Sequence, residues 1–191
     1  MELQDAIQKR KSVRKFSSKK PDWRNIIESI NSSLYAPMAG GIFNLKFLIV
    51  DDKKLIEGIA KWCEQDFIKE TKYVVVVISN SNLVKTPFPR RGEHFSTQQS
   101  GAAIQNFLLS LEEFELSTCW IGHMNEEKIG KILKIPEKYT LEALFPIGYS
   151  AEKKKTKKLK HDLYNALYFN EWKNKRMKKV EKIEARAPEG Y

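Results

Sequence analysis

The chain has 191 residues, of which 41% are hydrophobic and 30% charged, and its formal net charge is +10. This length is typical of one globular domain with a sizeable core, and no apolar run approaches the roughly 18 residues that a membrane span needs. The N-terminus is polar and acidic, unlike a secretory signal, and the two cysteines have no metal-ligand spacing, so we expect buried free thiols and a cytoplasmic protein.

The positive charge is uneven along the chain. Six lysines fall within residues 153–160 and seven further cations within residues 173–186, whereas the middle of the chain is nearly balanced. Such an excess favours an anionic partner, which is nucleic acid, an acidic surface or a phosphorylated small molecule. Because the middle is balanced, a nucleic-acid domain is not expected, and the basic tail is interpreted as either a weak helix or a disordered segment.

The first candidate site is a basic segment, residues 9–16, in which five of eight residues are cationic. Guanidinium groups bind phosphate oxygens with two hydrogen bonds, and a serine hydroxyl can donate one more. Arg10, Ser12 and Arg14 alternate onto one side if this segment is extended. The pattern predicts a phosphate site, and a solvated turn is the alternative.

Residues 22–35 have the pattern of an amphipathic helix. Asp22 is a typical capping residue, and Ile27, Ile30 and Leu34 fall on one apolar face. We therefore expect a helix that packs on the core through these three side chains.

A turn of small residues follows this helix. Pro37 biases the preceding residue away from helical geometry, and residues 38–41 (Met-Ala-Gly-Gly) allow a backbone to approach a flat ligand closely. Residues 45–50 then predict a buried strand, and Asp51-Asp52 begins another helix with an apolar inner face.

The middle of the chain contains the strongest strand signal. Residues 73–79 include Val-Val-Val-Val-Ile, which predicts a strand buried on both faces at the centre of a sheet. Residues 80–98 are polar and contain two prolines, so they predict a long irregular lid. Residues 101–116 predict a helix, because apolar side chains recur at helical spacing.

The last third alternates short strands and helices. Residues 118–121 predict a short strand closed by Gly122, in which Trp120 belongs to the core, and Asn125 caps a further helix. Residues 141–149 predict a strand that lies at an edge or a bulge, because it contains a proline. Residues 166–169 predict a small strand that lies as an arm on another subunit.

The order of these segments resembles the nitroreductase family of flavin enzymes over roughly residues 4–172. The similar motifs are those at residues 10–16, 36–37, 101–111, 117–122 and 146–149. This resemblance implies an α+β sandwich, with a central, mostly antiparallel sheet flanked by helices, built as an intertwined homodimer with shared FMN sites. It also implies that residues 1–172 form the FMN-binding domain and that residues 173–191 form a basic tail.

The resemblance implies an FMN-dependent oxidoreductase that passes hydride from NADH or NADPH to an electron-poor small molecule, of the nitroaromatic or quinone type. The chemistry then occurs at the flavin N5 and needs no catalytic side chain, which agrees with the lack of paired carboxylates or a metal-ligand cluster in the sequence. A flavin carrier or sensor without turnover is the alternative, because the family's polar Asn and Gln after Ala-Pro are Gly41 and Phe43 here.

The resemblance assigns the FMN phosphate to the basic segment. Arg10 and Ser12 would bind the phosphate with help from Lys11, while Arg14 would lie nearer the flavin ring. Lys160 would be a second phosphate cation, and Lys158 is the alternative in the same lysine run.

The resemblance assigns the ring to two other segments. Pro37, Met38, Ala39 and Gly40 of the other subunit would pack on the isoalloxazine, and Ile121 and Gly122 would run beside N5 and O4. Asn44 could replace one lost polar contact. The implied cofactor-binding residues are thus Arg10, Lys11, Ser12, Arg14, Pro37, Met38, Ala39, Gly40, Asn44, Ile121, Gly122, Lys158 and Lys160.

Overall fold

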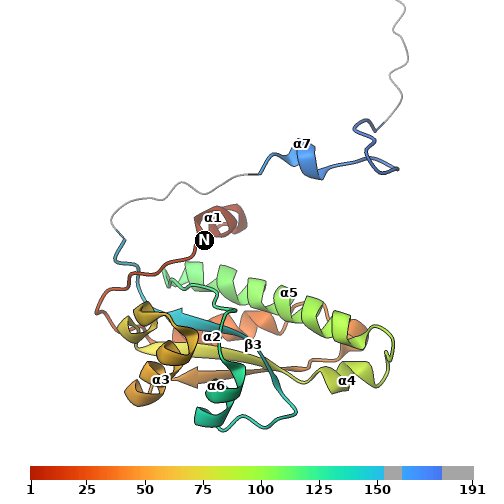
Figure 1. Ribbon diagram of the computed structural model, residues 1–191. Coiled ribbons are helices and arrows are strands. Elements are labelled where there is room, and N and C mark those ends of the chain that lie inside the picture. Colours follow the sequence, from red (N-terminus) through yellow and green to blue (C-terminus); the bar gives the residue numbers. More distant parts are fainter. Residues whose placement is uncertain (153–160, 178–191) are drawn as a thin grey trace, which may run out of the picture. The chain divides into compact units, whose positions relative to one another are not determined.

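A three-stranded sheet forms the centre of the larger part of the chain (Figure 1). The computed structural model describes residues 1–152 and 161–177, and the chain divides into two units, Met1–Lys155 and Thr156–Tyr191. In the first unit the strands are β1 (Leu45–Val50), β2 (Tyr73–Ser79) and β3 (Thr140–Ile147), in the order β1-β2-β3. Both pairings are antiparallel, which confirms the predicted sheet type.

Strand β2 is buried along its whole length, as its run of β-branched residues predicts. Its side chains alternate between two hydrophobic clusters, because successive residues of a strand point to opposite faces. Val75 and Val77 belong to one cluster, and Val74 and Val76 belong to the other. A strand covered on both faces needs apolar residues at every position, which explains the lack of alternation.

Two layers of helices cover the sheet (Figure 1). Helices α2 (Trp23–Ser33) and α5 (Gly92–Glu113) lie on one face, and α3 (Lys53–Cys63), η2 (Asp66–Glu70) and α6 (Glu126–Ile132) lie on the other. The remaining helices of the first unit are α1 (Leu3–Lys9), which packs on α5, the short η1 (Ala39–Gly41), and α4 (Ser81–Lys85). None of the described helices is both long and apolar enough to span a membrane.

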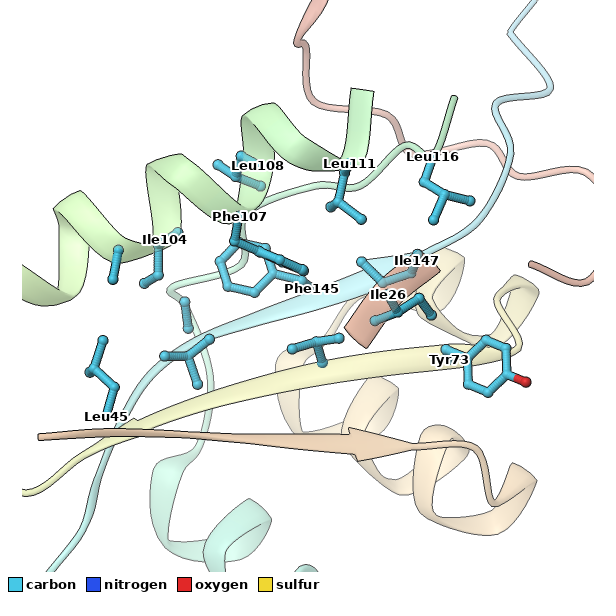
Figure 2. Close-up of a cluster of buried hydrophobic side chains, with 14 of the residues drawn as sticks. Ile26, Leu45, Tyr73, Ile104, Phe107, Leu108, Leu111, Leu116, Phe145 and Ile147 are labelled. Atoms are coloured by element: carbon cyan, nitrogen blue, oxygen red, sulfur yellow. The ribbon is translucent and has the colours of Figure 1, made fainter. Parts of the chain in front are cut away.

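The core between α5 and the sheet is built around Phe107 (Figure 2). Its ring meets the ring of Phe145 on β3 edge to face, with centroids 5.5 Å apart. Leu111 and Ile104 lie one turn away on the same side of α5. These residues carry the helical spacing seen in the sequence, so the predicted packing face of this helix is confirmed.

Side-chain caps fix where three of the helices begin. The Asp22 carboxylate accepts a hydrogen bond from the backbone N–H of Arg24, as expected for α2. Asp52 caps α3 and Asn125 caps α6 in the same way. Each cap satisfies one of the N–H groups that a helix leaves unpaired in its first turn.

The prediction of a long irregular lid at residues 80–98 is wrong. Helix α4 lies within it, and α5 begins at Gly92. The two prolines fall between the helices and not inside one. Gly92 is required for packing, since a Cβ atom there would lie 2.5 Å from the Cα atom of Lys85.

The predicted apolar face of α2 is also wrong in part. Ile26 and Ser29 are buried against the core, whereas Ile27 and Leu34 are exposed, and Tyr35 just after the helix is 80% exposed. Of the predicted face, Ile30 packs on the core, whereas Ile27 and Leu34 are left uncovered by the described residues.

The region after α5 forms single backbone pairs and no continuous strand. Ser117 pairs with Gly148 and Ile121 pairs with Leu144, so these residues extend the edge of β3 only locally. Pro146 lies on β3 opposite Val74, on the strand at the edge of the described sheet, as expected for a proline. Trp120 is not a core residue, because it is 42% exposed.

The described part of the second unit, residues 161–177, holds α7 (Leu163–Ala166). Residues 166–169 were expected as a strand, but Asp162 caps a short helix that includes Ala166. The ammonium of Lys175 lies 3.8 Å from the ring centroid of Tyr168 and 4.6 Å from that of Tyr164, and this cation–π contact organises the segment.

Candidate functional site

The basic segment runs extended along the edge of the fold. Helix α1 ends at Lys9, and the backbone N–H of Val13 then donates to the carbonyl of Thr118 at 3.0 Å. Val13 is 1% exposed and Phe16 is also buried, so these apolar side chains hold the segment against the core. Because residues of an extended chain alternate, Ser12 and Arg14 are turned to the exposed side.

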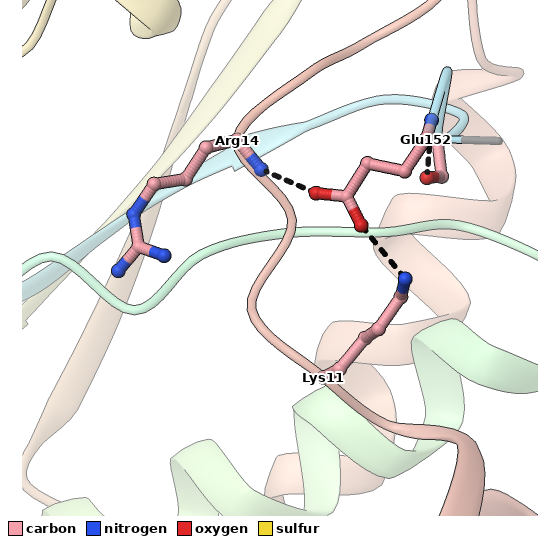
Figure 3. A network of polar contacts seen from close by, with 4 residues as sticks. Lys11, Arg14 and Glu152 are labelled. Atoms are coloured by element: carbon pink, nitrogen blue, oxygen red, sulfur yellow. Dashed lines mark hydrogen bonds and ion pairs between the residues drawn. The ribbon is translucent and has the colours of Figure 1, made fainter. Parts of the chain in front are cut away.

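Lys11 of the basic segment is already paired with Glu152 (Figure 3). The Lys11 ammonium lies 2.7 Å from a carboxylate oxygen of Glu152, and the backbone N–H of Arg14 reaches the other oxygen at 3.5 Å. The hydrogen bond from Lys11 lowers the pKa of Glu152 below its ordinary value. Lys11 is therefore less available to a phosphate than the sequence suggested.

The two arginines of the segment are free to meet an anion, whereas Lys9 faces Asp5 at 3.9 Å. In the described residues, the guanidinium groups of Arg10 and Arg14 form no ion pair, and the Ser12 hydroxyl makes no hydrogen bond. Figure 3 shows the Arg14 guanidinium turned away from Glu152. Two guanidinium groups and a hydroxyl on one short extended segment form a donor set that suits a phosphate dianion.

A buried hydroxyl beside the basic segment also lacks a partner. Thr118 pairs with Ser12 through the backbone, and its buried Oγ1 has no hydrogen-bond partner among the described residues. Buried polar atoms are normally satisfied, so an unpaired one next to a basic segment is consistent with a missing ligand. The residues present therefore fit a phosphorylated cofactor at this edge.

Ile121 and Gly122 follow Thr118 on the same stretch. Ile121 exchanges two backbone hydrogen bonds of 3.0 Å with Leu144, and its side chain is buried. Its N–H is therefore taken, whereas the N–H of the exposed Gly122 has no partner among the described hydrogen bonds. Of these two predicted contacts, Gly122 is the one with a free donor.

The turn at residues 37–41 lies beside a groove. Gly40 and Gly41 have φ values of 60° and 71°, in the left-handed region that glycine adopts most easily. A groove of about 430 Å³ is lined by Pro37, Met38, Ala39, Phe95, Gln98, Gln99 and Ala102. Its size and mainly apolar lining suit part of a flat organic ligand.

Asn44 does not lie on the surface of this groove. It is 1% exposed, its amide nitrogen donates to the Ser96 hydroxyl at 2.7 Å, and its oxygen accepts from Gln99 at 2.5 Å. Both ends of the amide are thus engaged inside the fold. The structure gives Asn44 a role inside the fold, and its direct contact with a cofactor stays a prediction.

The structure joins some predicted site residues and keeps others apart. The Ser12–Thr118 pair brings the basic segment to the stretch that ends at Gly122. Within the described residues, no hydrogen bond or ion pair links the basic segment to the 37–41 turn. Lys158 and Lys160 lie outside the described residues.

Gln99 is the residue that sequence reasoning missed. Its side chain binds the 37–41 turn, yet it lies on the buried face of α5. The available signal was the polar character of that face at Ser96, Gln99 and Ser100, where a core-facing helix is normally apolar.

The family model described as "Nitroreductase family" matches residues 7–78 and 59–149 of this chain. The iodotyrosine deiodinase of Thermotoga neapolitana is 26% identical over 178 residues, which span 80% of this chain and 90% of that protein. A protein of Methanothermobacter thermautotrophicus, provisionally named NADH dehydrogenase/NAD(P)H nitroreductase, is 26% identical over 164 residues and 83% of each chain.

A solved structure is similar as well. The crystal structure of an oxidised iodotyrosine deiodinase bound to FMN and 3-iodo-L-tyrosine superposes with a TM-score of 0.74 at 25% identity. The likeness covers 84% of this chain and 96% of that one.

Proposed function

This chain belongs to the nitroreductase family, and from that premise we propose that it is an FMN-dependent oxidoreductase. In this proposal it passes hydride from NADH or NADPH to an electron-poor small molecule, of the nitroaromatic or quinone type. The similar chain with bound FMN and the NAD(P)H in the name of one relative support this assignment.

The observation that carries the proposal is the unpaired donor set at Arg10, Ser12 and Arg14. A phosphate group there would receive charged hydrogen bonds from Arg10 and a hydrogen bond from Ser12. The Arg14 guanidinium, which also has no ion-pair partner among the described residues, is proposed to lie nearer the flavin ring. Lys11, held by Glu152, adds positive potential and less direct binding. Lys160, or Lys158, is proposed as a further phosphate cation.

Bound FMN would supply the hydride chemistry, and the protein would bind and orient it. The N–H of Gly122 is proposed to donate to the ring edge near N5 and O4, because it is free and exposed. Pro37, Met38, Ala39 and Gly40 are proposed to pack on the ring face, since they border the apolar groove.

We propose that the second half of each site comes from another copy of the chain. Leu3, Trp23, Ile27, Leu34 and Tyr35 are exposed on and near α1 and α2. A groove between these helices and α5 is lined in part by Leu3, Ala6 and Leu109. Apolar area of this kind normally marks an association surface, so a homodimer with shared sites accounts for it.

The boundary between domain and tail remains a proposal as well. Residues 1–172 are proposed as the FMN-binding domain and residues 173–191 as a basic tail. A cytoplasmic location also stays a prediction.

Flavin content and reduction test the proposed function. Purified protein saturated with FMN should bind about one FMN per chain, as expected for one basic segment per chain, and anaerobic NADH or NADPH should bleach the flavin absorbance. An acceptor panel of nitroaromatics and quinones should then restore it. Protein that takes up no FMN contradicts the proposal. Protein that binds FMN but is reduced by neither nicotinamide would be the carrier or sensor.

A further inference from the structure

A cluster of buried polar side chains lies under the 37–41 turn. It consists of Gln99 and Ser96 on α5 together with Asn44, which precedes β1, and is called the Gln99 cluster below. Gln99 is 4% exposed, and the other two are buried more deeply. Buried amides are costly unless their donors and acceptors are all used, so this cluster needs a reason to be there.

The Gln99 side chain binds the turn at both of its ends. Its Oε1 accepts from the backbone N–H of Ala39 at 3.0 Å, and its Nε2 donates to the carbonyl of Ile42 at 3.1 Å. Between these two residues lie Gly40 and Gly41, whose positive φ values suit glycine. The turn also has two backbone hydrogen bonds of its own, from Gly41 N–H to Met38 and from Ile42 N–H to Ala39. One side chain thus restrains the ends of the most flexible part of the turn.

The hydrogen bonds of the cluster fix its orientation without ambiguity. A backbone N–H can only donate and a carbonyl can only accept, so the Ala39 and Ile42 contacts determine which end of the Gln99 amide is which. The Gln99 nitrogen must then face the oxygen of Asn44, and the Asn44 nitrogen must donate to Ser96. The three side chains have one consistent arrangement.

No other common side chain provides this set of contacts. The position needs one acceptor and a nitrogen with two donors, at a length that reaches across the turn. Glutamate keeps the acceptor and lacks the donors, whereas methionine keeps the length and lacks both.

We propose that Gln99 is the positioning residue that holds the 37–41 turn against α5 and thereby sets where Met38 and Ala39 meet the cofactor ring. This inference rests on the proposed function, in which the turn packs on FMN. Gln99 itself does not touch the ring in this account. It acts through the turn, with Asn44 and Ser96 holding its amide in place.

The test compares Gln99→Met and Gln99→Glu with Gln65→Met in the full chain. Gln65 is half-buried at the start of η2, its side chain makes none of the described hydrogen bonds, and it lies in the helical layer on the other face of the sheet. Hydrogen exchange of residues 36–43 is measured without FMN. The FMN dissociation constant and the visible absorption spectrum of bound flavin are measured separately.

Gln99→Met should speed exchange at residues 36–43 by tenfold or more and leave residues 73–79 unchanged. It should also raise the FMN dissociation constant about tenfold, as the loss of hydrogen bonds predicts, and shift the flavin spectrum. Gln99→Glu should have an effect at least as large, because the Ala39 N–H keeps its acceptor but the buried carboxylate faces the Ile42 carbonyl and the Asn44 oxygen without a donor. Gln65→Met should match the wild type.

Three results would overturn the inference. The first is unchanged exchange at residues 36–43 in Gln99→Met. The second is faster exchange in residues 73–79 as well, which would mean a general loss of stability. The third is faster exchange at residues 36–43 with an unchanged FMN dissociation constant and an unchanged flavin spectrum. If the wild type binds no FMN, the proposed function fails, and the FMN-free exchange still reports whether Gln99 holds the turn.

If Gln99→Met does not fold, Ser96→Ala supplies the comparison with a smaller change. Ser96→Ala removes only the acceptor of the Asn44 amide, so its effect should be in the same direction and smaller than that of Gln99→Glu. An effect of Ser96→Ala larger than that of Gln99→Glu would also contradict the proposed order of contacts.

Discussion

The basic segment and the 37–41 turn are built in opposite ways. In the basic segment the backbone and the buried Val13 fix the chain, and the guanidinium groups of Arg10 and Arg14 are left without ion pairs in the described structure. In the turn the backbone contains two glycines, Gly40 and Gly41, and the buried side chain of Gln99 restrains it.

The difference follows from what each region is proposed to bind. A phosphate is recognised by charge and hydrogen bonds, so the donors must remain unpaired until it arrives. A flat ring is recognised by a surface of the right shape, so the backbone itself must be held still. Substitutions in the two regions should therefore have different signatures.

The largest effect is expected for Arg10→Ala. Loss of one charged hydrogen-bonding group to the phosphate should weaken FMN binding by about 30- to 100-fold. Riboflavin, which lacks the phosphate, should bind as it does to the wild type. Equilibrium titration with both flavins measures the ratio of the two dissociation constants.

Lys9→Ala is the matched control for this prediction. Lys9 is an exposed cation one residue away, and it faces Asp5 at 3.9 Å on α1. It should leave the preference for FMN over riboflavin intact. If Arg10→Ala weakened the binding of FMN and of riboflavin equally, the phosphate would not bind at this segment.

Val13→Ala tests whether packing fixes the basic segment. Removing two methyl groups from a fully buried site should lower the free energy of unfolding by about 2 kcal/mol, and FMN affinity should fall because the cations lose their position. Urea unfolding and FMN titration give the two values. Val50→Ala, at an equally buried site on β1, should cost similar stability and retain FMN affinity. Equal FMN affinity in Val13→Ala and Val50→Ala would contradict the claim that Val13 holds the cations in position.

Gly40→Ala and Gly41→Ala test the turn. Each puts an L-residue at positive φ, which should lower the free energy of unfolding by about 1 kcal/mol. At Gly40 the new Cβ atom would also lie 3.2 Å from the Phe88 ring, whereas at Gly41 no atom lies within 4 Å. Gly40→Ala should therefore be the more destabilising in urea unfolding. The reverse order would mean that the turn has another conformation in solution.

The smallest effect is expected for Glu152→Gln. Because the pKa of Glu152 is lowered in the folded chain, its carboxylate stabilises the fold above the ordinary value of 4.5 and loses this contribution as pH falls through the lowered pKa. The unfolding free energy of the variant should therefore decline less steeply than that of the wild type below about pH 4.5. The two free energies should differ by less than about 1 kcal/mol, because the ion pair is partly exposed.

The same variant releases Lys11 from its ion pair. FMN affinity at neutral pH should therefore rise a few-fold, because the site loses a negative charge and gains an unpaired cation. Titrations of wild type and variant at two salt concentrations measure this. Weaker FMN binding in Glu152→Gln would instead show that the carboxylate holds the basic segment in place.

Local signals were enough to predict much of the fold. The bounds of β1 and β2, and the caps at Asp22, Asp52 and Asn125, depend on neighbouring residues only.

The failures involve contacts that are distant in sequence. Gly92 was interpreted as part of a loop, but it is the place where α5 passes Lys85 too closely for any side chain. Asn44 was expected to reach a cofactor, and its actual partners lie more than fifty residues away on α5. Ile27 and Leu34 follow a helical pattern but are exposed, and we propose that another copy of the chain covers them.

The position of β2 has a consequence for biosynthesis. Its seven residues must pair with β3 on one side, and the 60 residues from 80 to 139 have to leave the ribosome before that partner exists. During that interval a strongly aggregating valine-rich edge is uncovered. Slower translation, or truncation before residue 140, should therefore send the nascent polypeptide to chaperones or inclusion bodies.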